Sequence, residues 1–240
     1  MSNYNRVYCR GDTHGNFDFL PYFCMDYKTT KKDLLIILGD CGINYFGGSR
    51  DAELKELICT NEITLFCLRG NHEMRPSDVR GMVEIDYCGA RAYIEYEYPN
   101  IIYAKDGEIY NINGKRFLTI GGAYSVDKWY RIEMGMGWFA NEQLSKDERA
   151  QILEKISGEN VDFILTHTCP LQFQPTDLFI SGINQATVDK EMEIWLTEVE
   201  EKVWYGNFLF GHFHQDRQIR PGVIMLYNSI IELIKLDRED

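Results

Sequence analysis

The sequence lacks paired cysteines and an excess of basic residues, and each absence excludes a class of protein. Its seven cysteines are odd in number and include no Cys-x-x-Cys pair, which argues against a Cys-rich zinc site and predicts reduced, buried thiols. Only 25 basic residues stand against 37 acidic ones, giving a formal net charge of −12. This balance disfavours an extended nucleic-acid surface, but it is compatible with a local cationic or metal-lined cleft.

Long apolar segments, repeats and linkers are also missing. No stretch approaches the roughly 18 consecutive apolar residues of a membrane span, and the first residues lack the basic segment and apolar core of a secretion signal. With 240 residues, of which 45% are hydrophobic, the chain is long enough to bury a sizeable core. We therefore expect a single domain over residues 1–240 in a cytoplasmic protein without membrane partners; the oligomeric state stays open.

Apolar runs recur along the chain, and each ends in a polar loop that contains glycine, histidine or an acid. Such runs are typical of buried strands. We expect helices between them, and the helix that begins at Ser145 has a capping-box pattern with Glu148. The expected strands cover residues 6–9, 33–38, 63–68, 161–165 and 207–210, and the expected helices cover 17–27, 50–59, 145–156 and 188–202. This alternation predicts an α/β fold with functional loops at the strand carboxyl ends.

A second kind of β segment is short, aromatic and bounded by turn signals such as Asp106-Gly107 and Asn113-Gly114. These segments cover residues 90–98, 101–104, 108–112 and 116–120, and the stretch 217–236 is similar. They predict hairpin-connected strands of a second, mixed or antiparallel sheet.

The histidines form the most informative pattern in the sequence. There are five, and every one lies in a short polar loop after an expected strand: His14, His72, His167, His212 and His214. A lone histidine is more often a surface or core residue than a ligand, but the joint placement favours a metal site. Imidazole and carboxylate groups suit Mn, Fe or Zn. Asp40 fits the anionic bridge that two ions about 3.5–4 Å apart require, and Asn71 adds a neutral oxygen.

In order along the chain, these blocks are Asp12-x-His14, Gly39-Asp40, Gly70-Asn71-His72-Glu73, His167 and Gly211-His212-x-His214. The set resembles the calcineurin-like metallophosphoesterase superfamily. The resemblance implies a four-layer α/β/β/α sandwich with two mixed sheets and a metal site at the strand carboxyl ends. It also implies one metal held by Asp12, His14 and His214, a second held by Asn71, His167 and His212, and Asp40 bridging the two.

The activity implied is hydrolysis of a phosphoester by a metal-bound hydroxide, with His72 near the scissile phosphate to protonate the leaving oxygen or stabilise the transition state. Two divalent ions are expected, manganese first, with iron, zinc, nickel or cobalt as alternatives. We expect a phosphatase acting on a phosphomonoester: a phosphorylated small molecule, nucleotide or phosphoprotein. The alternatives are a phosphodiesterase or nuclease acting on a nucleotide or short nucleic acid, and a non-catalytic metal-binding scaffold.

The second block departs from the pattern Gly-Asp-x-x-Asp-Arg-Gly of the related Ser/Thr protein phosphatases, because Ile43 and Asn44 stand at the last Asp and Arg. What orients His72 is therefore open. Glu73 is expected to support its loop. The candidate substrate contacts, for each of which a structural loop role is the alternative, are Asn44, Tyr45, Arg69, Lys128 and Arg131.

Overall fold

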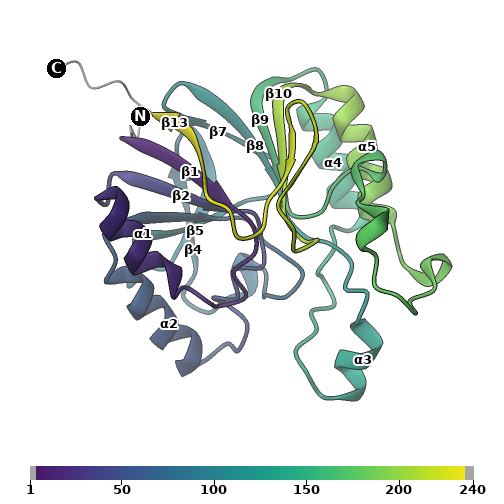
Figure 1. The fold of residues 1–240 in the computed structure, drawn as a ribbon, viewed down its shortest axis with the longest axis horizontal. Coiled ribbons are helices and arrows are strands. Elements are labelled where there is room, and N and C mark those ends of the chain that lie inside the picture. Colours follow the sequence, from purple (N-terminus) through teal and green to yellow (C-terminus); the bar gives the residue numbers. More distant parts are fainter. Residues whose placement is uncertain (1–3, 236–240) are drawn as a thin grey trace.

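Two mixed β-sheets pack against each other in the computed structural model, which describes residues 4–235 (Figure 1). The first sheet has seven strands in the order β13-β1-β2-β3-β6-β5-β4. Parallel pairing joins β1 to β2, β2 to β3 and β3 to β6, whereas the outer pairs are antiparallel. The strands are β1 (Arg6–Arg10), β2 (Asp33–Ile37), β3 (Thr64–Cys67), β4 (Val83–Tyr87), β5 (Ala90–Ile94), β6 (Ile101–Ala104) and β13 (Ile231–Lys235).

The second sheet has six strands in the order β11-β12-β10-β9-β8-β7. Its central pairs, β8 with β9, β9 with β10 and β10 with β12, are parallel. The strands are β7 (Glu108–Ile112), β8 (Lys115–Ile120), β9 (Asn160–Thr166), β10 (Trp204–Phe210), β11 (Arg217–Arg220) and β12 (Val223–Met225).

Helices lie on the outer sides of the two sheets (Figure 1). Helices α1 (Phe19–Tyr27) and α2 (Ser49–Cys59) accompany the first sheet, and α4 (Lys146–Ile156) and α5 (Glu191–Lys202) the second. The short helix α3 (Lys128–Glu133) stands away from both sheets. The capping box of Ser145 and Glu148 is present at the start of α4. Between residues 4 and 235, none of the helices is long and apolar enough to cross a membrane.

Three apolar clusters hold these layers together. One fills the space between the sheets, where Leu34 and Phe66 of the first sheet meet Phe117 and Leu209 of the second. Another packs α1 and α2 on the first sheet, and the third packs α4 and α5 on the second. Strand β2 is buried along its whole length because it is covered on both faces, which explains why four consecutive apolar residues follow Asp33 in it.

The two mixed sheets expected from the sequence are confirmed, but the expected distribution of strands between them is wrong. The segments 90–98 and 101–104 contain β5 and β6 and extend the first sheet, whereas β9 and β10 form the centre of the second. An apolar run shows that a strand is buried on both faces, but it does not show which sheet takes it. Strand β4 and helix α3 were not expected, and residue 236 of the expected stretch 217–236 lies outside the described residues.

Candidate metal centre

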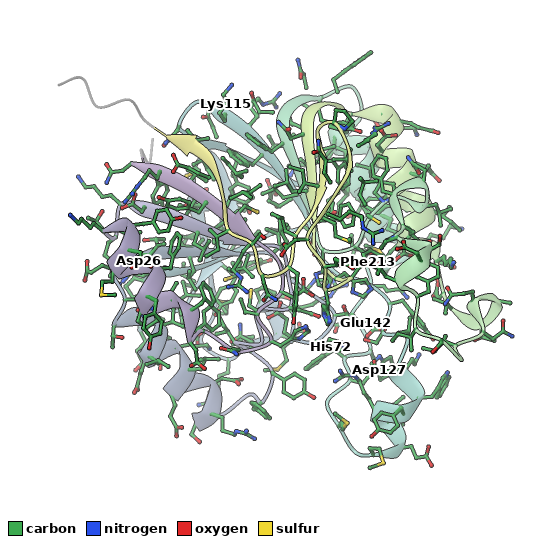
Figure 2. All side chains as sticks on the ribbon, viewed as in Figure 1. Asp26, His72, Lys115, Asp127, Glu142 and Phe213 are labelled. Carbon is green, nitrogen blue, oxygen red and sulfur yellow. The ribbon has the colours of Figure 1, made fainter. Side chains whose placement is uncertain are left out.

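The carboxyl ends of five parallel strands bring all the predicted metal ligands to one edge of the molecule. Asp12 and His14 follow β1, Asp40 follows β2, Asn71 and His72 follow β3, His167 follows β9, and His212 and His214 follow β10. Figure 2 shows His72, Glu142 and Phe213 at this end, far from Lys115 at the other end of the second sheet.

The backbone at these positions is held in an unusual conformation. His14, Asp40, His212 and His214 have φ values of 47°, 48°, 68° and 52°, in the left-handed region that residues other than glycine rarely adopt. Such strain persists where the surrounding structure enforces it, and it is concentrated at functional sites. The unfavourable backbone conformation at these four residues is therefore consistent with a functional role, in which it sets the direction of their side chains.

Gly70 allows the loops after β2 and β3 to approach each other closely. A Cβ atom built on Gly70 would lie 1.9 Å from Oδ1 of Asp40 and 2.2 Å from its backbone nitrogen. No side chain fits in this space. The glycine thus lets the backbone N–H of His72 donate to Asp40 Oδ1 at 2.8 Å.

Two groups of side chains have the spacing of metal ligands. Ligand atoms of Asp12, His14 and His214 lie within 4.8 Å of one another, and so do those of Asp12, Asp40 and His167. The Nε2 atoms of His14 and His214 are 2.9 Å apart. Oδ2 of Asp12 lies 3.4 Å from Nε2 of His214 and 3.8 Å from Nε2 of His14.

His167 presents one ring nitrogen to this centre because its other nitrogen is occupied. Its Nδ1 lies 2.7 Å from the carbonyl oxygen of Leu38, so Nδ1–H donates there and Nε2 is the ring nitrogen that could bind a metal in place of a proton. Nε2 is 2.9 Å from Asn71 Oδ1 and 3.5 Å from Asp40 Oδ2. The ring of His212 lies beside it, 5.0 Å between centroids.

The donor set fits divalent cations. Oδ2 of Asp12 is buried without a hydrogen-bond partner among the described residues, an arrangement that is costly unless a cation or donor meets it. Asn71 Oδ1 and His167 Nε2 likewise converge on one point from different strands. Nitrogen and oxygen donors of this kind suit first-row transition ions.

The carboxylates of Asp40 and Asp12 make the surroundings of His167 electrostatically negative. Burial alone lowers the pKa of His167, but the carboxylates of Asp40 and Asp12 raise it to about 9. Burial alone would raise the pKa of Asp40, but His167 and the neighbouring histidines hold it well below its usual range. Carboxylates that stay ionised when buried attract divalent cations as well as protons.

Two residues that the sequence analysis missed fix the orientation of Asn71. Nδ2 of Asn71 donates to Ser125 Oγ at 2.9 Å, and Ser125 Oγ in turn donates to Glu142 Oε2 at 2.6 Å. The backbone N–H of Ser125 also donates to Glu142 Oε1. This chain turns Oδ1 of Asn71 toward His167. No sequence signal could have found it, because its members come from separate loops without a recognisable motif.

Replacing Ser125 with alanine is expected to weaken metal binding by about 10- to 100-fold, because the amide of Asn71 loses the partner that orients it. Calorimetric titration with Mn²⁺ measures this change. Ser77→Ala, at an exposed position, is the matched control and should bind as the unaltered protein does. Equal affinities for Ser125→Ala and Ser77→Ala would show that Asn71 needs no such support.

Glu73 supports the loop, as expected. Its buried carboxylate accepts from the backbone N–H of Gly70 at 2.8 Å and of Gly42 at 3.2 Å. It thereby ties the loop after β3 to the loop after β2, which carries Asp40.

His72 faces donors rather than the aspartate found in the protein phosphatases. Its Nε2 lies 3.1 Å from Asn71 Nδ2 and 3.3 Å from Nη2 of Arg131, so Nε2 accepts and the neutral ring carries its proton on Nδ1. Arg131 is held by Asp127, whose Oδ2 is 2.8 Å from Nε of the arginine. Burial lowers the pKa of His72, and the nearby Arg131 lowers it further. Arg131 and Asn71 thus contact His72 where the protein phosphatases have an aspartate, the position that Ile43 occupies in this chain.

The candidate substrate contacts divide into two groups. Tyr45 and Arg131 line a cavity of about 460 Å³ together with His14 and His72. Asn44 is buried, 2% exposed, and does not line this cavity. Lys128 is also absent from the lining, and its ammonium lies over the ring of Trp138, 4.2 Å from the centroid. For Asn44 and Lys128 the structural role is therefore the better interpretation.

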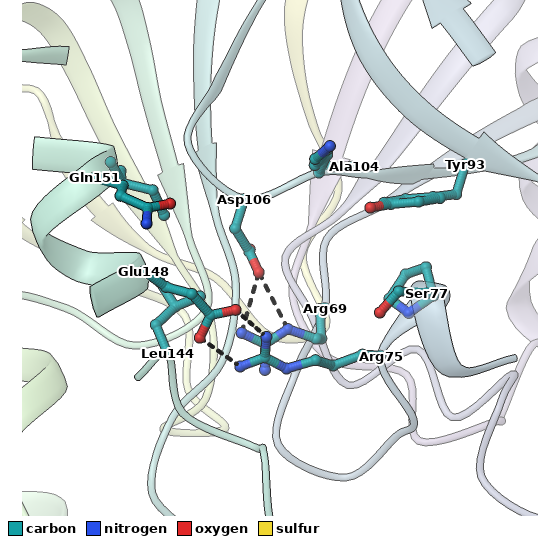
Figure 3. A pocket seen from close by; sticks show the side chains of 12 residues that line it. Arg69, Arg75, Ser77, Tyr93, Ala104, Asp106, Leu144, Glu148 and Gln151 are labelled. Carbon is teal, nitrogen blue, oxygen red and sulfur yellow. Dashed lines mark hydrogen bonds and ion pairs between the residues drawn. The ribbon is translucent and has the colours of Figure 1, made fainter. Parts of the chain in front are cut away.

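Arg69 also has a structural role, which corrects the expectation of a substrate contact. Its side chain is buried, and its guanidinium binds Asp106 and the backbone oxygens of Gly121 and Glu142. Figure 3 shows it beside Arg75, which pairs with Glu148, in a pocket that contains none of the predicted metal ligands. Arg69 faces away from the centre, although it is only two residues from Asn71.

The comparison with known families agrees with this geometry. The family model of the calcineurin-like phosphoesterases matches residues 6–216. A search of curated proteins found no match. The family comprises hydrolases that act on phosphoesters and generally use two divalent metal ions. Since the match covers more than half of the sequence, the chain belongs to the calcineurin-like phosphoesterase family.

Proposed function

We propose that the protein is a phosphatase that hydrolyses a phosphomonoester at this centre. Asp12, His14 and His214 would hold one divalent ion, Asn71, His167 and His212 would hold the other, and Asp40 would bridge them. When bound, such ions make water nucleophilic at neutral pH and neutralise the charge of phosphoryl oxygens. We propose manganese for both positions, with iron, zinc, nickel or cobalt as the alternatives, since nitrogen and oxygen ligands suit all of these ions.

The position of Arg131 is the observation that favours a phosphomonoester as the substrate. Its guanidinium lies 3.3 Å from Nε2 of His72 and lines the cavity that also contains His14. A phosphomonoester has one more ionisable oxygen than a diester, and a guanidinium can bind two phosphoryl oxygens with parallel hydrogen bonds. Arg131 is therefore placed to hold the additional charge of a monoester beside the metal centre.

His72 is proposed to transfer a proton to the leaving oxygen. Its ring lies at the edge of the cavity, with Nε2 directed toward Arg131. When substrate oxygens take over the N–H groups of Arg131, Nε2 no longer accepts from them. The bound phosphate dianion then favours a second proton on the ring, taken up from solvent, and Nε2–H can donate that proton to the leaving oxygen. A histidine in this position supplies general acid catalysis.

A phosphodiester is the second candidate substrate, because two cavities adjoin the predicted metal ligands. The cavity with His14 and His72 is one, and another of about 260 Å³ is lined by His212 and His214. The rings of His14 and His214 lie side by side, 4.8 Å between centroids, so the two cavities meet at the predicted metal ligands. A diester has two alcohol groups to place, and each cavity offers room for one.

Hydrolysis of nitrophenyl phosphate and bis-nitrophenyl phosphate, assayed side by side with Mn²⁺, separates these candidates. The proposal predicts faster turnover of the monoester. Arg131→Gln should lower kcat/KM for the monoester by roughly tenfold or more, and lower it less for the diester, because a charge-assisted hydrogen bond is lost. Arg80→Gln, at an exposed position, should change neither rate. Preference for the diester with no added effect of Arg131→Gln would overturn the monoester proposal.

A cytoplasmic location is also proposed. Cys9, Cys41, Cys67 and Cys169 are buried free thiols. Buried free thiols suit a reducing compartment.

A further inference from the structure

We propose that the cavity beside His212 and His214 binds a planar ring bearing N–H donors, such as a nucleobase, and that Glu193 recognises it. This inference rests on the proposed function, since it makes the substrate a nucleotide ester whose phosphate lies on the metal centre. The cavity is formed by the loop after β8, by residues 174–190, by the start of α5 and by the loop after β10.

The cavity is continuous with the metal centre. His212 and His214, both predicted ligands, form part of its wall, and Phe213 between them forms another part. A phosphate held at the centre would therefore place its alcohol group at the mouth of the cavity. With a volume of about 260 Å³, the cavity lies near the lower end of the range for sites that hold small organic ligands.

The walls of the cavity suit the flat faces of a planar ring. Tyr124, Phe179 and Phe213 contribute aromatic surface, and Leu178, Ile180 and Ile183 contribute aliphatic surface. The ammonium of Lys190 lies 5.1 Å from the ring centroid of Phe179, which keeps a cation beside this aromatic wall. Nucleobases stack on aromatic side chains regardless of which hydrogen-bond donors and acceptors each base carries.

Gln174, Gln185, Asp189, Lys190 and Glu193 are the polar or charged residues of the cavity besides the two histidines and Tyr124, and Glu193 differs from the other four in having a buried oxygen without a hydrogen-bond partner. Its side chain lies in the first turn of α5 and is only 4% exposed. Oε1 accepts from Thr168 Oγ1 at 2.8 Å, but Oε2 is buried and has no hydrogen-bond partner among the described residues. An unpaired buried acceptor is costly, and an N–H group of a bound ring would satisfy it. This carboxyl oxygen, beside aromatic and aliphatic walls, is therefore placed to bind a donor of a ring in the cavity.

Calorimetric titration of the His72→Gln protein in the presence of Mn²⁺ tests the inference, because this variant is expected to keep its metal ions but to hydrolyse the probes only slowly. The probes are guanosine 5′-monophosphate, which has ring N–H donors, and ribose 5-phosphate, which has the same phosphate and sugar but no ring. We expect the nucleotide to bind at least about tenfold more tightly. Glu193→Met should reduce this ratio by about tenfold, and Glu193→Gln, which keeps the shape and an acceptor, should reduce it less.

Glu198→Gln, at an exposed position of the same helix, is the control and should leave the ratio unchanged. Equal binding of the two probes, or a ratio insensitive to Glu193→Met, would overturn the inference. If Glu193→Met weakens both probes equally, Glu193 contacts the sugar or only maintains the wall, and ring recognition is again excluded. Failure of the proposed function would be seen separately, as absence of hydrolysis of the nitrophenyl esters.

Discussion

Replacing Asp40 with asparagine is expected to lower kcat/KM for nitrophenyl phosphate by about 10³-fold or more. Asp40 is the carboxylate shared by the two proposed metal positions, and its Oδ2 lies 3.5 Å from His167 Nε2 and 3.9 Å from His14 Nδ1. The amide of asparagine removes the negative charge that holds two cations at close distance. If one ion is lost, the negative charge of the phosphoryl oxygens is less neutralised and water is less readily activated as the nucleophile. Both losses contribute to the expected size of the effect.

The change is nearly isosteric, so the fold should persist. The amide oxygen of the new side chain can still accept from the backbone N–H of His72, as Oδ1 of Asp40 does at 2.8 Å. Thermal unfolding and metal content should be measured alongside the rate: we expect a folded protein with fewer bound ions. Asp86→Asn, in an exposed ion pair with Arg91, is the control. Undiminished turnover by the Asp40 variant would contradict the proposed centre.

Replacing His72 with glutamine should lower kcat by about 10²- to 10⁴-fold while metal binding is retained. His72 lies beside the predicted ligands, and its side chain contacts Asn71 and Arg131. The loss should depend on the leaving group. Nitrophenolate leaves readily without a proton, whereas an alkoxide does not, so an alkyl phosphate should suffer more than nitrophenyl phosphate.

This dependence distinguishes proton transfer from metal binding. A residue that holds an ion should affect both substrates equally and should reduce the metal content of the protein. Metal analysis and a pair of substrates with different leaving groups therefore serve as internal controls for His72→Gln. Equal losses for the two substrates, together with loss of metal, would make His72 a ligand and remove its proposed role.

The candidate metal centre could be predicted from the sequence because each predicted ligand lies in the loop that follows an apolar strand. Parallel strands end at the same edge, so local patterns around Asp12, Asp40 and Asn71 are enough to predict that these side chains meet. Arg69 shows the limit of this reasoning. It is only two residues from Asn71, but its side chain points into the pocket with Asp106 on the other side of the loop.

The residues that orient Asn71 could not be predicted from the sequence, for a different reason. Ser125 and Glu142 act on Asn71 through hydrogen bonds between loops that are distant in sequence, and neither residue belongs to a recurring motif. Glu193 could not be singled out from the sequence either. Its proposed role depends on its buried Oε2 atom having no hydrogen-bond partner among the described residues, which only the structure reveals. The allocation of β5, β6, β9 and β10 to sheets depends on tertiary packing, which strand patterns alone do not encode.

Anomalous X-ray diffraction from crystals grown with Mn²⁺ tests the central claim most directly. The proposed centre predicts two manganese ions about 3.5–4 Å apart. Asp40 should lie between them, with Asp12, His14 and His214 on one side and Asn71, His167 and His212 on the other. A single ion, or ions bound without Asp40, would contradict it.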